Sequence, residues 1–433
     1  MPPEPFAIRP GDAPPAARPA PRPSAPEGAP DPAPDPNRAT APAPAPDPGA
    51  TEDWRAGGFG IYVHWPFCKS KCPYCDFNSH VSAHVDHDAW RQALIADLEA
   101  AARLTPGRRA RTMFFGGGTP SLMPPATVAA LIDAVDRLWG FEPGAEITLE
   151  ANPTSVEAAA FRGYAAAGVN RVSMGVQALN DADLRALGRT HGAAEAMAAF
   201  DVARAVFRRV SFDLIYARQN QTPQAWEAEL RRALDLAADH LSLYQLTIEP
   251  GTRFAQLHAR GRLRGLPADD DAARMYELTQ ELCEAAGMPA YEISNHARPG
   301  DESRHNLIYW RYGDYVGAGP GAHGRLTVEG RRLATENLRA PGAWLEAMRA
   351  GRPAASFEEI APEDQAAEYL LMSLRLAEGT DPARHARLGG RPLDPERVAR
   401  LVEQGVLTWR AERLAATRKG RALLDAALRE LVA

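Results

Sequence analysis

From residue 60 onward, short β-branched and aromatic runs alternate with longer stretches whose apolar residues recur at helical spacing. The short runs predict six strands: Gly60–His64, Thr112–Phe115, Glu146–Glu150, Arg171–Val176, Val210–Tyr216 and Leu241–Ile248. The longer stretches predict helices over Ala89–Ala101, Pro125–Trp139, Ser155–Ala167, Ala193–Val206 and Pro223–Ala238. This alternation is typical of βαβ units in a parallel sheet, so the fold class is α/β. Six strands fit either a partial barrel or a doubly wound sheet, and the periodicity does not distinguish them.

Polar or glycine-rich residues stand at the ends of these predicted strands. They are His64, the run Gly116–Pro120, the run Glu150–Pro153, Gln177, Asp213 (within the fifth strand) and Thr247. In parallel α/β folds, ligands bind at the carboxyl ends of the strands. The pattern therefore predicts one shared site at the mouth of the sheet.

The two ends of the chain have a different character. Residues 1–56 begin with a segment of 50 that holds 18 of the 38 prolines, which predicts a disordered or polyproline-like tail. We interpret it as a solvated extension, with a partner-binding arm as the alternative. From about Ala361 the pattern is mostly helical, and Val406–Trp409 with Leu414–Thr417 predicts a small hairpin. The predicted domains are thus 57–290, a linking region 291–360, and a winged-helix-like domain 361–433, to which we assign a packing or substrate-lid role rather than DNA binding.

Charge and hydropathy exclude several classes of protein. The net charge of -6 provides no basic field for nucleic acid. No run of 18 apolar residues predicts a membrane span, and no secretory signal begins the chain. We therefore expect a cytoplasmic protein whose thiols stay reduced, which argues against disulfides.

Three of the four cysteines lie within CKSKCPYC, as Cys68, Cys72 and Cys75. Structural zinc sites usually use four protein ligands, and no second cysteine pair follows. Cys283 lies in the helical stretch Arg274–Ala286 and is expected to be buried. Three thiolates on a four-iron cluster leave one iron free for another ligand, since most clusters use four cysteines.

This C-x3-C-x2-C loop after the first strand resembles the radical S-adenosylmethionine (SAM) superfamily. The flanking residues Tyr62–Phe67 and Asp76–Ser79 are similar to the branch that holds oxygen-independent coproporphyrinogen III oxidases and HemW-type heme chaperones. The resemblance spans residues 59–433. It implies a partial (β/α)6 barrel, a [4Fe-4S] cluster on Cys68, Cys72 and Cys75, and SAM on the open iron.

The resemblance also implies a set of SAM-binding residues, while the catalytic residues stay unassigned. The set is Tyr62, Tyr74, Gly118, Thr119, Glu150, Gln177, Arg189, Asp213, Thr247 and His323. Acidic residues suit the ribose or sulfonium, and an arginine suits a carboxylate.

Two features choose between the members of this branch. The oxidases carry a fourth cysteine two positions after the third, where this chain has Phe77. His305-Asn306-Leu307-Ile308-Tyr309-Trp310 resembles the H-N-x-x-Y-W motif that is associated with heme in the chaperones. Imidazole is a common axial ligand of heme iron, so His305, Tyr309 and Trp310 are candidate heme residues. If this segment is helical, His305 and Tyr309 share a face.

The resemblance therefore implies a heme chaperone that passes heme to an acceptor hemoprotein, with respiratory enzymes as one candidate class. It leaves enzymatic turnover undecided, with a chaperone favoured, and allows a monomer or a dimer that contacts membrane proteins only transiently. Oxygen-independent coproporphyrinogen III oxidation is the alternative. A three-cysteine zinc or redox switch is the third hypothesis.

Two further stretches complete the analysis. Gly317–Ala322 fits the dinucleotide fingerprint G-x-G-x-x-A, but Pro320 and the absence of a following helix pattern argue against that function. Ala217–Thr222 replaces a loop that is rich in glycine and proline in the family, so its geometry is not predicted.

Overall fold

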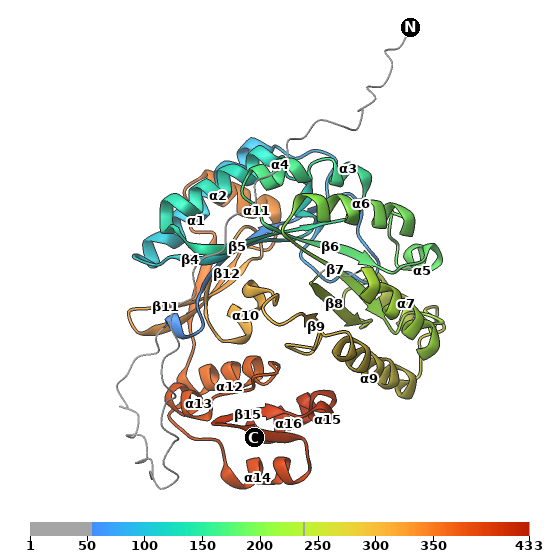
Figure 1. Ribbon diagram of the computed structural model, residues 1–433. Helices are drawn as coiled ribbons and strands as arrows, with labels where there is room; N and C mark the ends of the chain where they lie inside the picture. Colours follow the sequence, from blue (N-terminus) through green and yellow to red (C-terminus); the bar gives the residue numbers. More distant parts are fainter. Residues whose placement is uncertain (1–53, 237–238, 433) are drawn as a thin grey trace, which may run out of the picture. The chain divides into compact units, whose positions relative to one another are not determined.

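The computed structural model describes residues 54–236 and 239–432 (Figure 1). The predicted tail therefore lies outside the described residues, except for its last three. Those three, Trp54–Ala56, form a short 3-10 helix (η1) instead of continuing a tail. The Trp54 ring packs edge-on against Phe59, and the Arg108 guanidinium lies over the Trp54 ring, 4.8 Å from its centre.

All six predicted strands are present and pair in parallel in sequence order. They are β1 (Phe59–Trp65), β4 (Ala110–Gly117), β5 (Phe141–Ala151), β6 (Arg171–Gln177), β7 (Arg209–Tyr216) and β8 (His240–Gln245). The sixth ends at Gln245, three residues before its predicted end, so Thr247 lies in the loop beyond it. The carboxyl ends of the six strands meet at one edge of the sheet, as the sequence predicts.

The sheet continues on both sides of these six strands. On one side β9 (Asn295–Ala297) runs antiparallel to β8. On the other side β10 (Asp314–Ala318) runs parallel to β1, and an antiparallel series follows: β11 (His323–Val328), β12 (Arg331–Asn337) and β13 (Ala355–Glu359). The order of the eleven strands is β13-β12-β11-β10-β1-β4-β5-β6-β7-β8-β9, with β13 and β9 at the two edges. The sheet is therefore open, which confirms the partial barrel.

Helices cover the outer side of the curved sheet (Figure 1). They are α1 (His87–Leu104), α2 (Pro125–Trp139), α3 (Ser155–Ala158), α4 (Phe161–Ala166), α5 (Asp181–Ala186), α6 (Ala193–Val206), α7 (Pro223–Leu236), α9 (Asp269–Ala285) and α11 (Pro341–Arg349). Two short helices, η2 (Pro120–Leu122) and α8 (Arg253–Ala259), follow the ends of β4 and β8, and the Phe254 N–H donates to the carbonyl of Pro73 in the cysteine loop. The single helix predicted over Ser155–Ala167 is two helices, and the predicted end at Ala238 lies outside the described residues. In contrast, α10 (Arg304–Trp310) lies on the inner side of the sheet (Figure 1).

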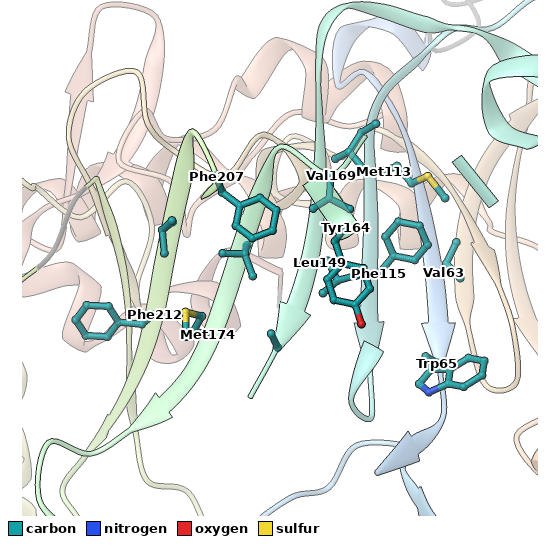
Figure 2. Close-up of a cluster of buried hydrophobic side chains, with 14 of the residues drawn as sticks. Val63, Trp65, Met113, Phe115, Leu149, Tyr164, Val169, Met174, Phe207 and Phe212 are labelled. Atoms are coloured by element: carbon teal, nitrogen blue, oxygen red, sulfur yellow. The ribbon is translucent and has the colours of Figure 1, made fainter. Parts of the chain in front are cut away.

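The hydrophobic core fills the layer between the sheet and the outer helices. Figure 2 shows side chains such as Phe115, Leu149 and Phe212 projecting from neighbouring strands into this layer, and each is fully buried. Burial of one such side chain contributes about 1.5–3 kcal/mol. Because alternate residues of a strand face opposite sides of the sheet, every second residue of β1 and β4 faces the inner side, away from this core.

The C-terminal part has its own small core. It comprises α12 (Pro362–Ser373), α13 (Pro382–Gly389), α14 (Pro395–Glu403), the hairpin of β14 (Leu407–Arg410) and β15 (Arg413–Ala416), α15 (Arg418–Ala422) and α16 (Leu424–Val432). Leu370, Val398, Leu407 and Leu414 are among the apolar residues that pack together there. The predicted hairpin is confirmed, one residue away from its predicted bounds. None of the described helices is long and apolar enough to cross a membrane.

The two remaining stretches are also placed. Gly317–Ala322 leads from the end of β10 into a turn before β11 and opens no helix, as predicted. In the loop after β7, Ala217 and Asn220 adopt left-handed backbone angles (φ 55° and 60°). The buried Arg218 holds this loop through ion pairs with Asp183 (2.6 Å) and Glu229 (2.5 Å).

Candidate functional site

The cysteine loop connects β1 to α1 at the carboxyl edge of the sheet. Cys68 ends the short strand β2 (Phe67–Cys68), which pairs with β3 (His80–Val81), and Cys72 and Cys75 lie between these strands. All three thiols are free and partly exposed, whereas Cys283 is buried in α9 as expected. They line one cavity of about 670 Å³, which we call the cluster cavity.

Hydrogen bonds from the opposite walls reach the sulfur atoms. The Thr119 hydroxyl donates to Cys68 Sγ (3.4 Å), and Arg189 Nη1 donates to Cys72 Sγ (3.3 Å). Burial is the main cause that raises the pKa of Cys68 and Cys75, and the neighbouring thiols raise both further. A positively charged group beside Cys68 and Cys75 would favour their thiolate forms.

Most of the predicted SAM residues line this same cavity. They are Tyr74, Gly118, Thr119, Glu150, Gln177, Arg189, Asp213 and Thr247. They come from β5, β6 and β7 and from the loops after β1, β4, β6 and β8, which is the clustering that the parallel sheet predicts. Sequence reasoning missed Asn152, whose side chain accepts from Arg189 (2.6 Å) and donates to Thr119 (3.2 Å). Its position two residues after Glu150, just beyond the end of β5, was the available signal.

The glycine turn after β4 passes directly beneath the cysteine loop. A Cβ on Gly118 would lie 2.7 Å from the carbonyl oxygen of Phe67, so only glycine fits there. The backbone N–H groups of Gly118 and Thr119 donate to the carbonyls of Trp65 (2.7 Å) and Phe67 (2.8 Å). These bonds fix the turn against the loop that carries the first cysteine.

Two half-buried carboxyl groups, Glu150 on β5 and Asp213 on β7, line the cluster cavity from either side of β6. Burial, and then the charge of Asp213, raise the pKa of Glu150 to about 8, although a hydrogen bond from the Gly117 N–H acts in the opposite direction. Burial likewise raises the pKa of Asp213 to about 6. Glu150 is therefore largely protonated at neutral pH until a cation enters the cavity.

A second cavity of about 640 Å³ adjoins the first, and we call it the aromatic cavity. Its aromatic lining is Tyr62, Phe77, Tyr309, Trp310, Tyr312 and Tyr315. Asp76, Phe77, Gly117 and Glu150 line both cavities, so they form a shared wall. Tyr62 and His323, which were grouped with the SAM residues, line the aromatic cavity instead.

The H-N-x-x-Y-W motif forms α10, and its histidine differs from expectation. His305 is buried (1% exposed), and it lines neither cavity. One ring nitrogen bonds to the Thr112 hydroxyl (2.7 Å), and the other bonds to the Tyr309 hydroxyl (2.7 Å). His305 and Tyr309 therefore share a helix face as predicted, but His305 presents no free nitrogen to a ligand. Tyr309 and Trp310 do line the aromatic cavity.

Comparison with known proteins places this geometry in a family. Residues 62–233 match the radical SAM superfamily, and residues 360–423 match the HemN C-terminal domain. The chain is 39% identical over 373 residues to the heme chaperone HemW of Escherichia coli (strain K12), across 85% of this chain and 96% of that protein. The chain belongs to the HemW family of radical SAM proteins. A Mycobacterium tuberculosis (strain H37Rv) HemW is 39% identical over 383 residues, across 86% of this chain and 95% of its own length.

Two further relatives extend this comparison. The mitochondrial radical S-adenosyl methionine domain-containing protein 1 of Bos taurus is 37% identical over 391 residues, across 86% of this chain and 87% of that protein. The solved coproporphyrinogen III oxidase (HemN) of Escherichia coli superposes with a TM-score of 0.72 at 24% identity, across 86% of this chain and 90% of that one. The latter likeness confirms the fold of the HemW family member described here.

Membership of the HemW family and the radical SAM superfamily implies a [4Fe-4S] cluster and SAM. The residues present fit both groups. Within residues 54–236 and 239–432, no three His, Cys, Asp or Glu side chains converge closely enough to hold a single metal ion. The Arg189 Nε, buried without a hydrogen-bond partner, offers one donor beside the cavity.

The raised pKa of Glu150 predicts that SAM binding depends on pH. Below about pH 8 the folded protein holds this proton, and the positively charged sulfonium favours its release. SAM affinity should therefore rise from pH 6 to pH 8, by at most about tenfold per pH unit, and then level off. Calorimetry in buffers of different ionisation enthalpy would detect the released proton. In Glu150→Gln the affinity should be nearly independent of pH, and an equally steep profile in that variant would contradict the assignment.

Proposed function

We propose that this protein is a heme chaperone that carries a [4Fe-4S] cluster and SAM in the cluster cavity and heme in the aromatic cavity. It passes the heme to an acceptor hemoprotein, for which a respiratory enzyme is one candidate class. The observation that carries this proposal is the similarity to HemW chaperones along nearly their whole length. The aromatic cavity beside the cysteine loop supports it, because aromatic side chains offer flat surfaces to a porphyrin.

In this proposal Cys68, Cys72 and Cys75 ligate the cluster, and Thr119 and Arg189 donate hydrogen bonds to two of their sulfurs. Such bonds tune a cluster's reduction potential. The carboxyl groups of Glu150 and Asp213 interact with SAM. The cluster would supply an iron site for the amino and carboxylate groups of SAM.

The heme motif acts chiefly through its aromatic residues. Trp310 and Tyr309 provide walls for the porphyrin, and His305 holds the Tyr309 hydroxyl in place. Direct ligation of iron by His305 would first require the loss of both of its hydrogen bonds. A cytoplasmic location, a transient contact with membrane proteins and the oligomeric state stay predictions.

Heme titration of the anaerobically purified protein tests this function. We expect saturation at about one heme per chain and transfer to an apo-hemoprotein on mixing, followed by absorbance. Trp310→Ala should weaken heme binding roughly tenfold, since an aromatic contact contributes about 0.5–1.5 kcal/mol beyond its buried area. The control is Trp409→Ala, because Trp409 is half exposed on the C-terminal hairpin and lines neither cavity.

No specific heme binding would overturn the chaperone proposal. Turnover of coproporphyrinogen III under the same conditions would then support the oxidase. Phe77, in place of a fourth cysteine, weighs against that outcome. Iron and sulfide analysis separates both from a zinc or redox switch, which would contain no inorganic sulfide.

A further inference from the structure

Two histidines, His64 and His323, line the aromatic cavity, and His305 packs against Tyr62 and Tyr309 of its lining. Among the described residues, only His323 of these three has a ring without a hydrogen bond. His64 is held on both sides, by the Tyr62 hydroxyl (3.0 Å) and by the carbonyl of Asn78 (2.9 Å). His305 is likewise held on both sides, as described above. His323 makes no hydrogen bond through its ring in the described part of the chain, and its side chain is 57% exposed.

The strand geometry directs His323 into the cavity. His323 begins β11, and Arg325 lies two residues further along, so both side chains project from the same face of the strand. The intervening Gly324 and the buried Leu326 face the core. Both His323 and Arg325 line the aromatic cavity.

The neighbouring strand continues this wall with aromatic rings. Tyr315 on β10 pairs with Arg325 across the sheet. Its ring meets that of Tyr309 edge-to-face, with 4.5 Å between the ring centres. His323 thus belongs to one continuous lining that ends at the residues of the heme motif.

A carboxylate stands beside the free imidazole. Glu336 is the cross-strand partner of His323 on β12, and its Oε1 lies 3.8 Å from His323 Nε2. A carboxylate beside one ring nitrogen of a metal-binding histidine helps to orient the ring. The second ring nitrogen of His323 stays available to a metal ion.

Three arginines line the aromatic cavity, and they differ in whether a carboxylate already pairs with them. The buried Arg332 is paired with Asp314, and Arg325 is paired with Glu368 (2.9 Å). Arg339 is exposed and makes no ion pair with any described residue. An exposed arginine without an ion pair can bind a carboxylate of a ligand, and heme carries two carboxylates on one edge.

We propose that His323 is the axial ligand of heme iron in the aromatic cavity and that Arg339 binds a heme carboxylate. This assignment rests on the proposed heme-binding function and makes it specific. The heme would then lie against Phe77 and Glu150, the wall that also bounds the cluster cavity. His305 becomes a positioning residue that acts through Tyr309.

Anaerobic titration of the full-length protein with hemin tests the axial ligand. His323→Ala should raise the dissociation constant at least tenfold and abolish the absorption spectrum typical of histidine-ligated heme. Added imidazole should restore that spectrum, which a merely structural role would not allow. The matched control is His258→Ala, because His258 is exposed on α8 and lines neither cavity.

Arg339→Gln tests the carboxylate contact. It should weaken binding of hemin several-fold and leave binding of hemin dimethyl ester, which has no free carboxylates, unchanged. Equal weakening of both ligands would overturn the role of Arg339.

The outcomes separate this inference from the function on which it rests. If wild-type protein binds one heme and His323→Ala binds it with the same affinity and spectrum, the inference is wrong and the chaperone function stands. If binding weakens but imidazole restores nothing, His323 is no axial ligand. If wild-type protein binds no heme, the proposed function itself fails.

Discussion

Cys72→Ala is expected to abolish loading of the iron–sulfur cluster and, with it, tight SAM binding. Cys72 is one of three thiols on the cluster cavity, and it also accepts the hydrogen bond from Arg189. Its loss would leave two protein ligands for a four-iron cluster, where three is already one fewer than usual. After anaerobic reconstitution, we expect iron and sulfide contents near zero in the variant and near four of each per chain in the wild type.

Cys283→Ala provides the matched control for this prediction. Cys283 is buried in α9, has no place in either cavity, and is the remaining cysteine of the chain. Its replacement should cost about 1 kcal/mol of stability at most and leave the iron content unchanged. Full iron and sulfide in Cys72→Ala, or their loss in Cys283→Ala, would contradict the assignment of the cluster to this loop.

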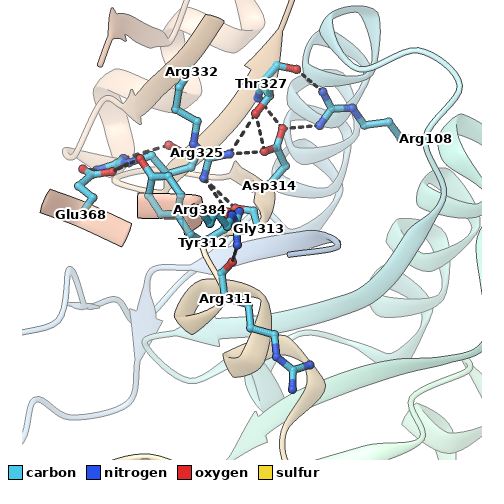
Figure 3. A network of polar contacts seen from close by, with 11 residues as sticks. Arg108, Arg311, Tyr312, Gly313, Asp314, Arg325, Thr327, Arg332, Glu368 and Arg384 are labelled. Atoms are coloured by element: carbon cyan, nitrogen blue, oxygen red, sulfur yellow. Dashed lines mark hydrogen bonds and ion pairs between the residues drawn. The ribbon is translucent and has the colours of Figure 1, made fainter. Parts of the chain in front are cut away.

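Asp314→Asn is expected to lower the free energy of unfolding by about 3–5 kcal/mol. Asp314 begins β10 and is fully buried, and its carboxylate accepts from Arg108 (2.5 Å), from Arg332 and from the N–H of Thr327 (Figure 3). Both arginine side chains are at most 5% exposed. A neutral amide would leave them buried without a compensating charge, which is the most costly way to break such a network.

Urea unfolding followed by circular dichroism would measure this loss as a lower midpoint. The control is Glu277→Gln, which removes a solvent-exposed ion pair with Arg274 on α9. Exposed pairs of this kind contribute about 0–1 kcal/mol, so its midpoint should hardly move. A change of similar size in both variants would show that the Asp314 network contributes no more to stability than an exposed ion pair.

The parallel strands could be predicted because each is a buried run with a clear helical stretch before the next. The cluster cavity could be predicted for the same reason: strand ends such as Glu150 and Gln177 must meet at one edge of a parallel sheet. The strands β10, β11 and β12 were not predicted. β10 has only five residues, and arginines such as Arg325 on β11 and Arg332 on β12 interrupt the apolar pattern of the next two strands. The buried ion pair of Arg332 with Asp314 takes the place of an apolar contact there.

The aromatic cavity could be predicted only in part. The motif showed Tyr309 and Trp310, but burial and two hydrogen bonds withdraw His305 from the cavity, and no local pattern reveals that. The place of His323 depends on the pairing of β11 with β10, which joins segments by tertiary contacts alone. Sequence spacing therefore located the cysteine loop but did not reveal that His323 and Arg325 of β11 line the aromatic cavity.

The position of β1 in the sheet also has a consequence for synthesis on the ribosome. β1 pairs on one side with β4, which follows soon after it, and on the other side with β10, which begins only at Asp314. Because the ribosome adds about 5–20 residues per second, the order of translation separates these two pairings in time. The three cysteines and most walls of the cluster cavity are thus translated well before β11 supplies His323 and Arg325. The residues that line the cluster cavity are thus mostly present on the nascent chain while the β10 side of β1 still has no partner strand.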